Sequence, residues 1–590
     1  MQLTKGAIGN LINRYKAVLK KCHLMNTFGS LAVAGMLVMG GAGVAGAADD
    51  VALEGKNTYD SAETPTVNHL MGGWLVNTPE TAGNAKGDIT LTVNGGTISE
   101  IIGGSYAQGL TAENNELLTV THGNITTTIS GEKTTSAEFV VGGSKVAGGA
   151  GAKLKTGKTS LTINGGTFGT QGKTNDYELV MGGNYAKTAG SSNLTATTEG
   201  SSVAVNGGTF HASVVGGSVA HNYSENGSIT VTDNGNTSVT ITGGTFNSSE
   251  RSLTDGQGGI NLKAAVIGGG LAYGANTSTV LGSSDNPVTS SVTIDGKNTQ
   301  VNGKVVAGSV VANGGYAALV HGDTLLSMIG GTVNDDLVGG GMVQDAAPLS
   351  DEKPNSNLIV TGNAGVMVAG GTAKGEIVGG NYMRGDGSAR VKNSTVSITG
   401  GMFAAAEDSQ NKAQYVIGGN KSMAYAGDTA KTLVEKDSGV LVDGDVTIAD
   451  GAVVGGSMAK AEKDGKATAT VEGNSSVTVN KGTLAGVVGG GLAETYSHAD
   501  GGAAASAVDG TSSVTINGGT INGIAYGAVA DNAGTSSAAV VGGGLANGDG
   551  STATVDSTSV TIAGGKINGK VVAGGLAING GTTTAGETPC

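Results

Sequence analysis

A short phrase recurs along the chain: a β-branched run ends in Asn-Gly-Gly-Thr, and a second apolar run follows and ends in Gly-Gly and a small residue. The clearest copy is SVTINGGT at residues 513–520, which is followed by AVVGGGLA at residues 539–546. The same couplet stands at residues 91–107, 203–220 and 560–577. The pattern gives about a dozen units of roughly 40 residues each, and such a period is typical of solenoids and other repeat arrays.

Each unit contains the signals for short strands separated by tight corners. Runs such as SVTI, LTVN and VAVN alternate Val, Ile or Leu with Ser or Thr, as strands with one buried face do. The Asn-Gly-Gly that follows suits the φ > 0 conformations that a sharp corner requires. An Asn-Gly corner also closes antiparallel hairpins, but the second run, such as SVVGG, is very short and has its own Gly-Gly end. We therefore predict an all-β chain that forms a parallel β-helix, or β-solenoid, with two coils in each unit.

The composition favours one repeat array over several globular domains. The 590 residues include 108 Gly and only 6 Pro. Aromatic residues make up 3%, as expected where only small or β-branched side chains fit a narrow interior. Disorder is the alternative for a chain so rich in Gly, but the hydrophobic residues, 38% of the total, lie largely in the alternating runs.

The first 47 residues have the layout of a signal peptide with a signal helix. Residues 28–44 are apolar and small, and Ala45-Gly46-Ala47 fits a signal-peptidase site; an uncleaved membrane anchor is the alternative. The segment before them is positively charged and contains Lys5, Arg14, Lys16, Lys20 and Lys21. Removal of these five cations changes the balance from 33 basic and 47 acidic residues to 28 and 47, a net charge of −19. Such a surface is soluble and does not bind nucleic acid through its phosphates.

The long basic segment and the repeats together resemble a known class of bacterial proteins. INRYKAVLKKCHLMNTFGSLAVAG, at residues 12–35, resembles the extended signal peptides of type V secretion, and the NGGT and VVGG repeats resemble passenger domains of autotransporter adhesins. This resemblance implies a right-handed parallel β-helix that is exported through the inner membrane and displayed at the outer membrane or the cell surface. The family usually ends in a transmembrane β-barrel, whereas the last repeat here runs to Gly581. The barrel is then encoded in a separate chain, or the chain is truncated, or it is released by another route.

These observations divide the chain into four parts. Residues 1–47 form the signal peptide, and residues 48–87, with two Pro, Trp74 and little periodicity, form an N-terminal cap or variable segment. A solenoid needs such a cap because its first coil otherwise exposes unpaired strand edges. Residues 88–581 form the repeat passenger, and residues 582–590 a short tail.

No catalytic site, cofactor or metal site is predicted. β-Helix enzymes that act on polysaccharides use paired carboxylates on neighbouring coils, usually in a groove lined by aromatic residues. Acidic pairs occur here at Asp335-Asp336, Asp351-Glu352 and Glu407-Asp408, and all are interpreted as solvated loop charges. The His and Cys residues have no spacing that resembles a metal site.

Two sets of residues are candidates for ligand binding. Tyr106, Tyr185 and Tyr382 each follow the second glycine pair, so they are expected to form a partial ladder at one corner. A structural stack is the preferred interpretation of this ladder, and a platform for sugar is the alternative. Arg384, Gly385 and Asp386 form the tripeptide of integrin ligands after a glycine corner, where an exposed loop is expected; chance occurrence is the alternative.

The sequence therefore predicts a secreted or surface-bound adhesin without catalytic activity. Many weak and similar contacts along the repeats would bind a host-cell or matrix receptor or a surface glycan through avidity. The alternatives are a carbohydrate-active β-helix enzyme, a polysaccharide lyase or hydrolase, and a purely structural surface fibre that self-associates.

Overall fold

The computed structural model describes the chain from Asp49 to Gly586 with gaps. The described residues are 49–54, 58–60, 66–76, 86–108, 119–148, 152–171, 178–188, 193–223, 226–247, 264–346, 356–404, 414–425, 427–495, 501–525 and 537–586. They belong to one compact unit, Ala48–Cys590. The predicted signal peptide and its helix, residues 1–47, lie outside the described residues. The described part contains no helix with the length and hydrophobicity that a membrane crossing requires.

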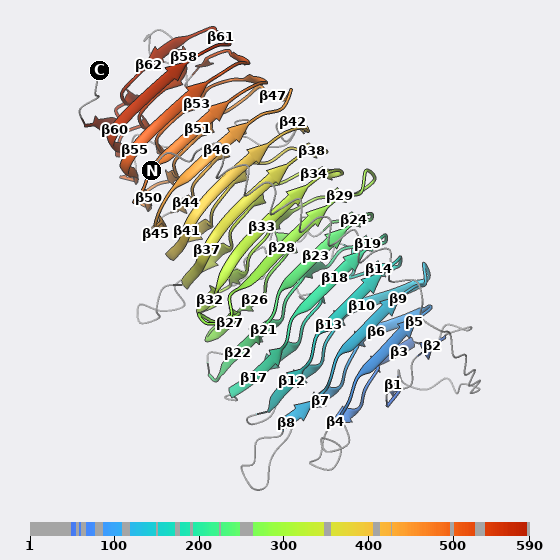
Figure 1. Cartoon of the computed structure of the whole chain (residues 1–590). Coiled ribbons are helices and arrows are strands. Elements are labelled where there is room, and N and C mark those ends of the chain that lie inside the picture. The colour runs from blue at the N-terminus through green and yellow to red at the C-terminus, as the bar shows by residue number, and fades with distance from the viewer. Residues whose placement is uncertain are drawn as a thin grey trace. The chain divides into compact units, whose positions relative to one another are not determined.

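The described unit is a parallel β-solenoid, as predicted, built on three long sheets. One coil runs through β18 (Ser201–Val205) of sheet B, β19 (Thr209–Phe210) and β20 (Ser213–Val215) of sheet A, and β21 (Val219–Asn222) of sheet C. It returns to sheet B through β22 (Ser228–Asp233). Among the described strands, 23 belong to sheet A, 23 to sheet B and 14 to sheet C. A further sheet lies at the Asn-Gly-Gly-Thr position of later coils and has four short strands, β47 (Thr447–Ile448), β52 (Thr483–Leu484), β56 (Thr520–Ile521) and β61 (Lys566–Ile567). In Figure 1, equivalent strands of successive coils lie side by side in chain order.

Sheet C and the second half of sheet B each contribute one strand, or one end of a long strand, to a coil. Sheet C consists of β4 (Leu75–Val76), β7 (Tyr106–Gln108), β11 (Lys145–Ala147), β16 (Tyr185–Thr188), β21, β26 (Leu271–Tyr273), β31 (Val310–Ala312), β36 (Met342–Ala346), β40 (Tyr382–Gly385), β44 (Lys421–Ala424), β49 (Met458–Ala461), β54 (Leu492–Thr495), β59 (Leu545–Asn547) and β63 (Leu576–Ile578). The second half of sheet B consists of β2 (Thr58–Tyr59), β5 (Ile89–Val93), β9 (Ile125–Ile129), β13 (Thr159–Ile163), β18, β23 (Thr237–Ile241), β28 (Val288–Ile294), β33 (Gly322–Met328), the ends of β37 (Ser356–Val368) and β41 (Gly387–Ile398), β46 (Ser438–Val442), β51 (Ser475–Val479), and the ends of β55 (Ala503–Ile516) and β60 (Ser551–Ile562).

One repeat unit makes one coil, so the prediction of two coils per unit was wrong. Leu161 pairs with Val203 and Val203 pairs with Val239, and each residue belongs to the next copy of the couplet. The reason is that the two apolar runs of a couplet lie on different sheets. A turn closes only after the chain has also passed through sheet C and returned to sheet B.

Identical positions of successive coils stack into ladders, which explains the repetition. Ile163, Val205 and Ile241 are register partners in sheet B and are fully buried. Phe168, Phe210 and Phe246 stack in the same interior, with ring centroids 5.0 and 4.7 Å apart. Each such buried side chain contributes roughly 1.5–3 kcal/mol, so stability accumulates coil by coil.

The Asn-Gly-Gly corner depends on its second glycine. Gly166, Gly208 and Gly244 occupy this position in three successive coils and have φ values of 114°, 112° and 107°. A side chain is strained in this region of backbone space, which confirms the role predicted for the corner glycines.

The residue after the second glycine pair carries an interior hydrogen-bond ladder. The backbone N–H of Ser144 donates to Oδ1 of Asn184 at 2.9 Å, and the backbone N–H of Asn184 donates to Oγ of Ser218 at 3.0 Å. All three residues are fully buried. A short acceptor at this position satisfies a backbone N–H of the preceding coil, which explains why the couplet ends in a small residue.

The solenoid strands extend beyond the predicted boundaries. β1 (Asp49–Ala52) pairs with β3 (Thr66–Met71), and β3 pairs with β6 (Gly96–Ile102), so strands of sheet A begin well before residue 88. At the other end, β64 (Thr582–Ala585) pairs with β60 in sheet B. The pairs between described strands are parallel except that of β57 (Ile524–Ala525) with β58 (Ser537–Val541).

Candidate functional site: a charged and aromatic seam

The outer faces of sheets A and C pack against each other. Ile101 of β6 packs with residues of sheet B, whereas its neighbour Ile102 packs with Tyr106 of sheet C. Ala107, next to Tyr106, packs with sheet B in turn. Because successive residues of a strand point to opposite faces, Ile102 and Tyr106 lie on the faces that point away from sheet B. We call the side chains at the positions of Glu100, Ile102, Tyr106 and Gln108 in every coil the A–C seam.

The three predicted tyrosines occupy one column of this seam. Tyr106 and Tyr185 are both register partners of Lys145, and Tyr382 lies at the same position of β40. Their exposed fractions are 5%, 0% and 4%. The tyrosines thus share a corner position but do not form a continuous ladder, because Lys145 separates the first two. Their burial fits the structural interpretation and presents no ring face for sugar.

A buried ion pair lies at the N-terminal end of the seam. Nζ of Lys145 forms an ion pair with the carboxylate of Glu100 and lies 4.5 Å from the ring centroid of Tyr106. Nε2 of His69 lies 3.5 Å from the same carboxylate, and its Nδ1 lies 2.6 Å from Oδ1 of Asp50. Burial lowers the pKa of Lys145, while Glu100 acts in the opposite direction. These contacts link polar and charged side chains of four consecutive coils.

Aromatic rings continue the seam beyond this ion pair. The hydroxyl of Tyr185 lies 3.0 Å from Nδ1 of His221, and the His221 ring stacks on Tyr223 with centroids 3.9 Å apart. Burial lowers the pKa of His221 to about 3, with a smaller effect from Lys187. The imidazole is therefore neutral at physiological pH and serves as a packing group.

A second charged cluster lies in the middle of the chain. Nζ of Lys304 lies 2.8 Å from Oδ1 of Asp335 and also pairs with Asp336, and Lys421 pairs with Glu376. Burial alone would lower the pKa of Lys304, but the carboxylates of Asp336 and Asp335 raise it well above its ordinary value. Against the effect of burial, Lys304 and Lys421 lower the pKa of Asp336. Lys304 is therefore protonated and Asp336 ionised at neutral pH.

Tyr382 lies between the two lysines of this central cluster. Nζ of Lys304 and Nζ of Lys421 lie 5.3 and 5.2 Å from its ring centroid, and its hydroxyl donates to Sδ of Met423 at 3.1 Å. Burial raises the pKa of Tyr382, although the two cations act in the opposite direction. The phenol thus stays neutral and supplies a cation–π contact instead of a nucleophile.

The interpretation of the first acidic pair as solvated loop charge was wrong. Asp336 directly precedes β35 (Leu337–Val338) in sheet A, and its side chain is buried in the ion pair with Lys304. Alternation along the strand places it on the seam face, which its local sequence does not reveal. The other pairs, Asp351-Glu352 and Glu407-Asp408, lie outside the described residues.

The Arg384, Gly385 and Asp386 tripeptide lies at the end of β40 instead of in an exposed loop. Gly385 is buried with φ 93°, and Arg384 and Asp386 are half-buried. The backbone N–H of Thr429 donates to Oδ1 of Asp386 at 2.5 Å, and the Arg384 guanidinium lies 4.8 Å from the ring centroid of Tyr425. Both charged groups are engaged within the solenoid, so this placement gives the integrin-ligand hypothesis no support.

The central cluster of the seam ties neighbouring coils together and is poorly suited to acid–base catalysis. General acid–base chemistry needs a group with a pKa near the working pH, whereas the lysines of the central cluster stay protonated and Asp336 stays ionised. Within the described ranges, no group of three or more His, Cys, Asp or Glu side chains is placed to hold a metal ion. Cross-coil ion pairs instead tie sheet A to sheet C.

Sequence reasoning missed the three lysines that organise the seam, although a signal for two of them was present. Lys145 and Lys421 follow GGS and GGN, as the tyrosines of the same column do. A long cation in a column of Tyr, Val, Leu and Met indicates a buried partner. Lys304 has no such marker, because it lies on sheet A, ahead of the Ala307-Gly308 corner.

Comparison with known protein families, curated protein sequences and solved structures finds no match to this chain. The three parallel sheets and the buried ion pairs define the class of the protein: a repeat β-solenoid with a buried, charged A–C seam.

Proposed function

We propose that this chain is the secreted passenger of an autotransporter-type protein and acts as an adhesin. Three features support the proposal: the signal-peptide layout of residues 1–47, the resemblance of the repeats to such passengers, and the solenoid fold. The partner would be a host-cell or matrix receptor or a surface glycan. An outer-membrane barrel, in the same or a separate chain, would anchor the passenger at the cell surface.

The observation that carries the proposal is the register of the coils. Ser160, Ser202 and Ser238 are register partners, so one outward position recurs at the strand spacing of about 4.8 Å. Repetition of a weak contact on one rigid support raises the overall affinity by avidity without any single strong site.

The proposal is tested by the adhesion of mature chain on beads to host cells and matrix proteins. We expect bead retention to fall steeply when whole coils are deleted, because each deletion removes contacts that act together. Deletions of single loops between strands are the control and should have a small effect. If the beads adhered to none of the cell types and matrix proteins, the adhesin function would be refuted. If bead retention did not depend on the number of coils, the multivalent mechanism would be refuted.

The export route has its own test. Expression of the full chain in a Gram-negative host should give an extracellular or surface-bound product. Its mass should correspond to a chain that begins at Ala48. Replacement of Ala45 and Ala47 by bulky residues should block cleavage and retain the product in the inner membrane. A product that stays in the cytoplasm would contradict the proposal.

The carbohydrate-active enzyme is the second candidate, and one observation favours it. Asp336 and Glu376 lie at the same seam position of adjacent coils, and Tyr382 is nearby. Release of reducing or unsaturated sugar ends from a polysaccharide, lost in Glu376→Gln, would support this candidate. The buried ion pairs of both carboxylates argue against it.

A further inference from the structure

Two adjacent outward rows of the second half of sheet B carry no charge along the described strands. The outward residues of the second half of sheet B are those at the positions of Thr90 and Thr92 in β5 and their register partners in the following coils. Along the described strands from β5 to β60 none of these residues is charged, and most are Ser or Thr. We call this surface the hydroxyl face.

The hydroxyl face is regular and stiff. Its rows repeat at about 4.8 Å from coil to coil, and two outward residues of one strand lie about 7 Å apart. Most of the positions are half-buried to exposed, whereas Ser327, Gly365 and Gly439 are buried. Oγ of Ser202 donates to Oγ of Ser160 across two coils at 3.4 Å. β-Branched Thr has few rotamers, so little conformational entropy is lost when a ligand covers this surface.

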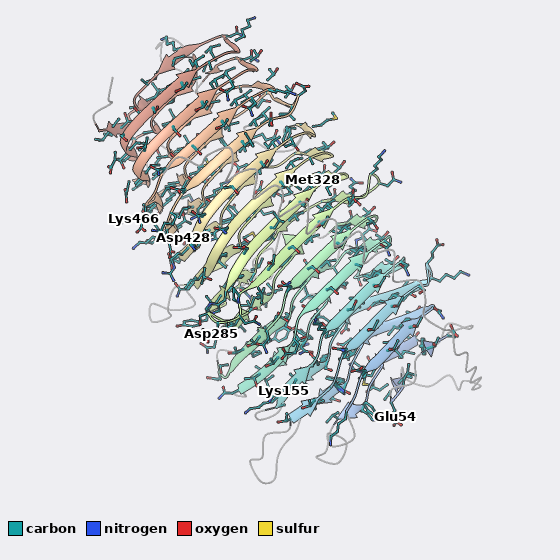
Figure 2. All side chains as sticks on the ribbon, viewed as in Figure 1. Glu54, Lys155, Asp285, Met328, Asp428 and Lys466 are labelled. Atoms are coloured by element: carbon teal, nitrogen blue, oxygen red, sulfur yellow. The ribbon has the colours of Figure 1, made fainter. Side chains whose placement is uncertain are left out.

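The neutrality of the face contrasts with its surroundings. Exposed carboxylates of Asp88, Glu199 and Glu472 lie along the corner that precedes these strands, and the exposed carboxylate of Asp323 lies at the start of β33, one outward position before the hydroxyl face. The neighbouring first half of sheet B carries exposed lysines, among them Lys155 and Lys466, which are labelled in Figure 2. Exposed sheet surfaces usually carry charges that prevent association, and a whole face without them indicates a contact surface.

The charge pattern also selects the occupant. A charged polymer would gain no ion pair on this face. A second copy of the chain, with its net charge of −14, would bring its acidic corners toward those of the first. A neutral polysaccharide chain has hydroxyl groups and C–H faces that match the hydroxyls and methyls of Ser and Thr, and it adds no charge.

We propose that the hydroxyl face binds a neutral, unbranched polysaccharide whose chain lies flat on successive coils. This inference rests on the proposed adhesin function and names its ligand class. Each sugar gains only weak hydrogen bonds, because every one replaces a bond to water, so binding depends on many coils in parallel.

The test measures co-sedimentation of the mature chain with insoluble cellulose and mannan, and with polygalacturonate gel as the acidic counterpart. The face variant combines Thr162→Lys, Thr240→Lys and Thr478→Lys. The matched control combines Thr121→Lys, Thr195→Lys and Thr468→Lys, which adds the same charge at exposed positions of the first half of sheet B. Thermal melts check that both variants fold like the parent.

We expect the parent and the control to be retained on at least one neutral polymer and not on polygalacturonate. The face variant should bind about tenfold more weakly, because its ammonium groups lose water against a neutral ligand. No retention of the parent on either neutral polymer, or equal loss in both variants, would overturn the inference. Adhesion to cells that survives in the face variant would overturn it while leaving the adhesin function intact. Concentration-dependent dimers that only the face variant loses would assign the face to a second copy instead.

Discussion

Lys421 of sheet C pairs with Glu376, which directly precedes β39 (Ile377–Val378) of sheet A in the preceding coil, and the two side chains are only 5% and 15% exposed. Because this ion pair is shielded from water and its two partners come from different sheets, it holds the outer faces of these sheets together. Removal of one partner leaves the other charge buried and unpaired, which costs far more than the net contribution of the intact pair.

Lys421→Met should therefore destabilise the central coils by about 3–5 kcal/mol. Met fits this column, since Met458 is the register partner of Lys421 in the next coil. Hydrogen exchange of the central strands and urea unfolding measure the effect. Arg390→Ala, which removes an exposed ion pair with Glu435, is the control and should cost less than about 1 kcal/mol. The double variant Lys421→Met and Glu376→Leu should recover most of the loss. A loss from Arg390→Ala as large as that from Lys421→Met would contradict this account.

Asp233 gives a prediction for pH dependence. Its carboxylate is buried in the interior and accepts hydrogen bonds from Oγ and the backbone N–H of Ser218, and burial raises its pKa from 3.8 to about 6. The folded state therefore holds this proton more tightly than the unfolded state. Its stabilising contribution is complete below about pH 4 and is lost as the pH rises through 6, a difference of about 3 kcal/mol.

Asp233→Asn should consequently raise stability at pH 7 and have little effect near pH 4. Unfolding by urea at both pH values measures the difference. Asp285→Asn, at an exposed position labelled in Figure 2, is the control and should change stability little at either pH. A variant whose stability relative to the parent is the same at pH 4 and pH 7 would show that Asp233 is not the titrating group.

Gly208→Ala tests the corner. With φ at 112°, a Cβ atom at this residue is strained and would lie 3.0 Å from the carbonyl oxygen of Gly166. We expect a loss of about 1–2 kcal/mol, visible as a lower thermal midpoint. Gly365→Ala is the matched control, because that glycine has no positive φ and its added Cβ meets only ordinary contacts. It should be neutral or stabilising, and a loss as large as that of Gly208→Ala would exclude the conformational explanation.

Asn184→Ala tests the interior ladder. Its Oδ1 accepts the backbone N–H of Ser144, and its Nδ2 donates to Oγ1 of Thr156 and to the carbonyl of Thr197 at 3.0 Å. The variant should lose about 1–3 kcal/mol or more, since these buried groups are left without partners. Asn164→Ala removes an exposed ladder contact with Asn206 and should stay within about 0.5 kcal/mol. Amide exchange of Ser144 reports the loss directly, and an unchanged exchange rate would argue against the ladder.

The strands with one buried face and the glycine corners could be predicted from short stretches of sequence. Alternation at residues 201–205 predicts the strand, and Asn-Gly-Gly at residues 206–208 predicts the corner, because both depend on neighbouring residues alone. The strands of sheet C escaped prediction, since Val219–Asn222 is buried on both faces and shows no alternation. Without this third sheet the number of residues per coil could not be counted.

The seam was predictable only in part, for a related reason. The position after the glycine pair marks Tyr106, Tyr185 and Tyr382 as equivalent, and the structure places them in one column. The partners of the lysines, such as Glu100 for Lys145, lie about a whole coil away in the chain. Contacts at this separation follow from the closure of a turn, which no local pattern encodes.

The stacking of equivalent residues also makes the length of the array adjustable. Val205 and Ile241 occupy the same rung position, so excision of residues 206–241 would connect Val205 to Thr242, and Ile294 would then rest on Val205. Each remaining residue would still meet a neighbour of its own kind. A chain built in this way can be shortened or lengthened in whole turns, and the span of its binding surface would change without redesign of any joint.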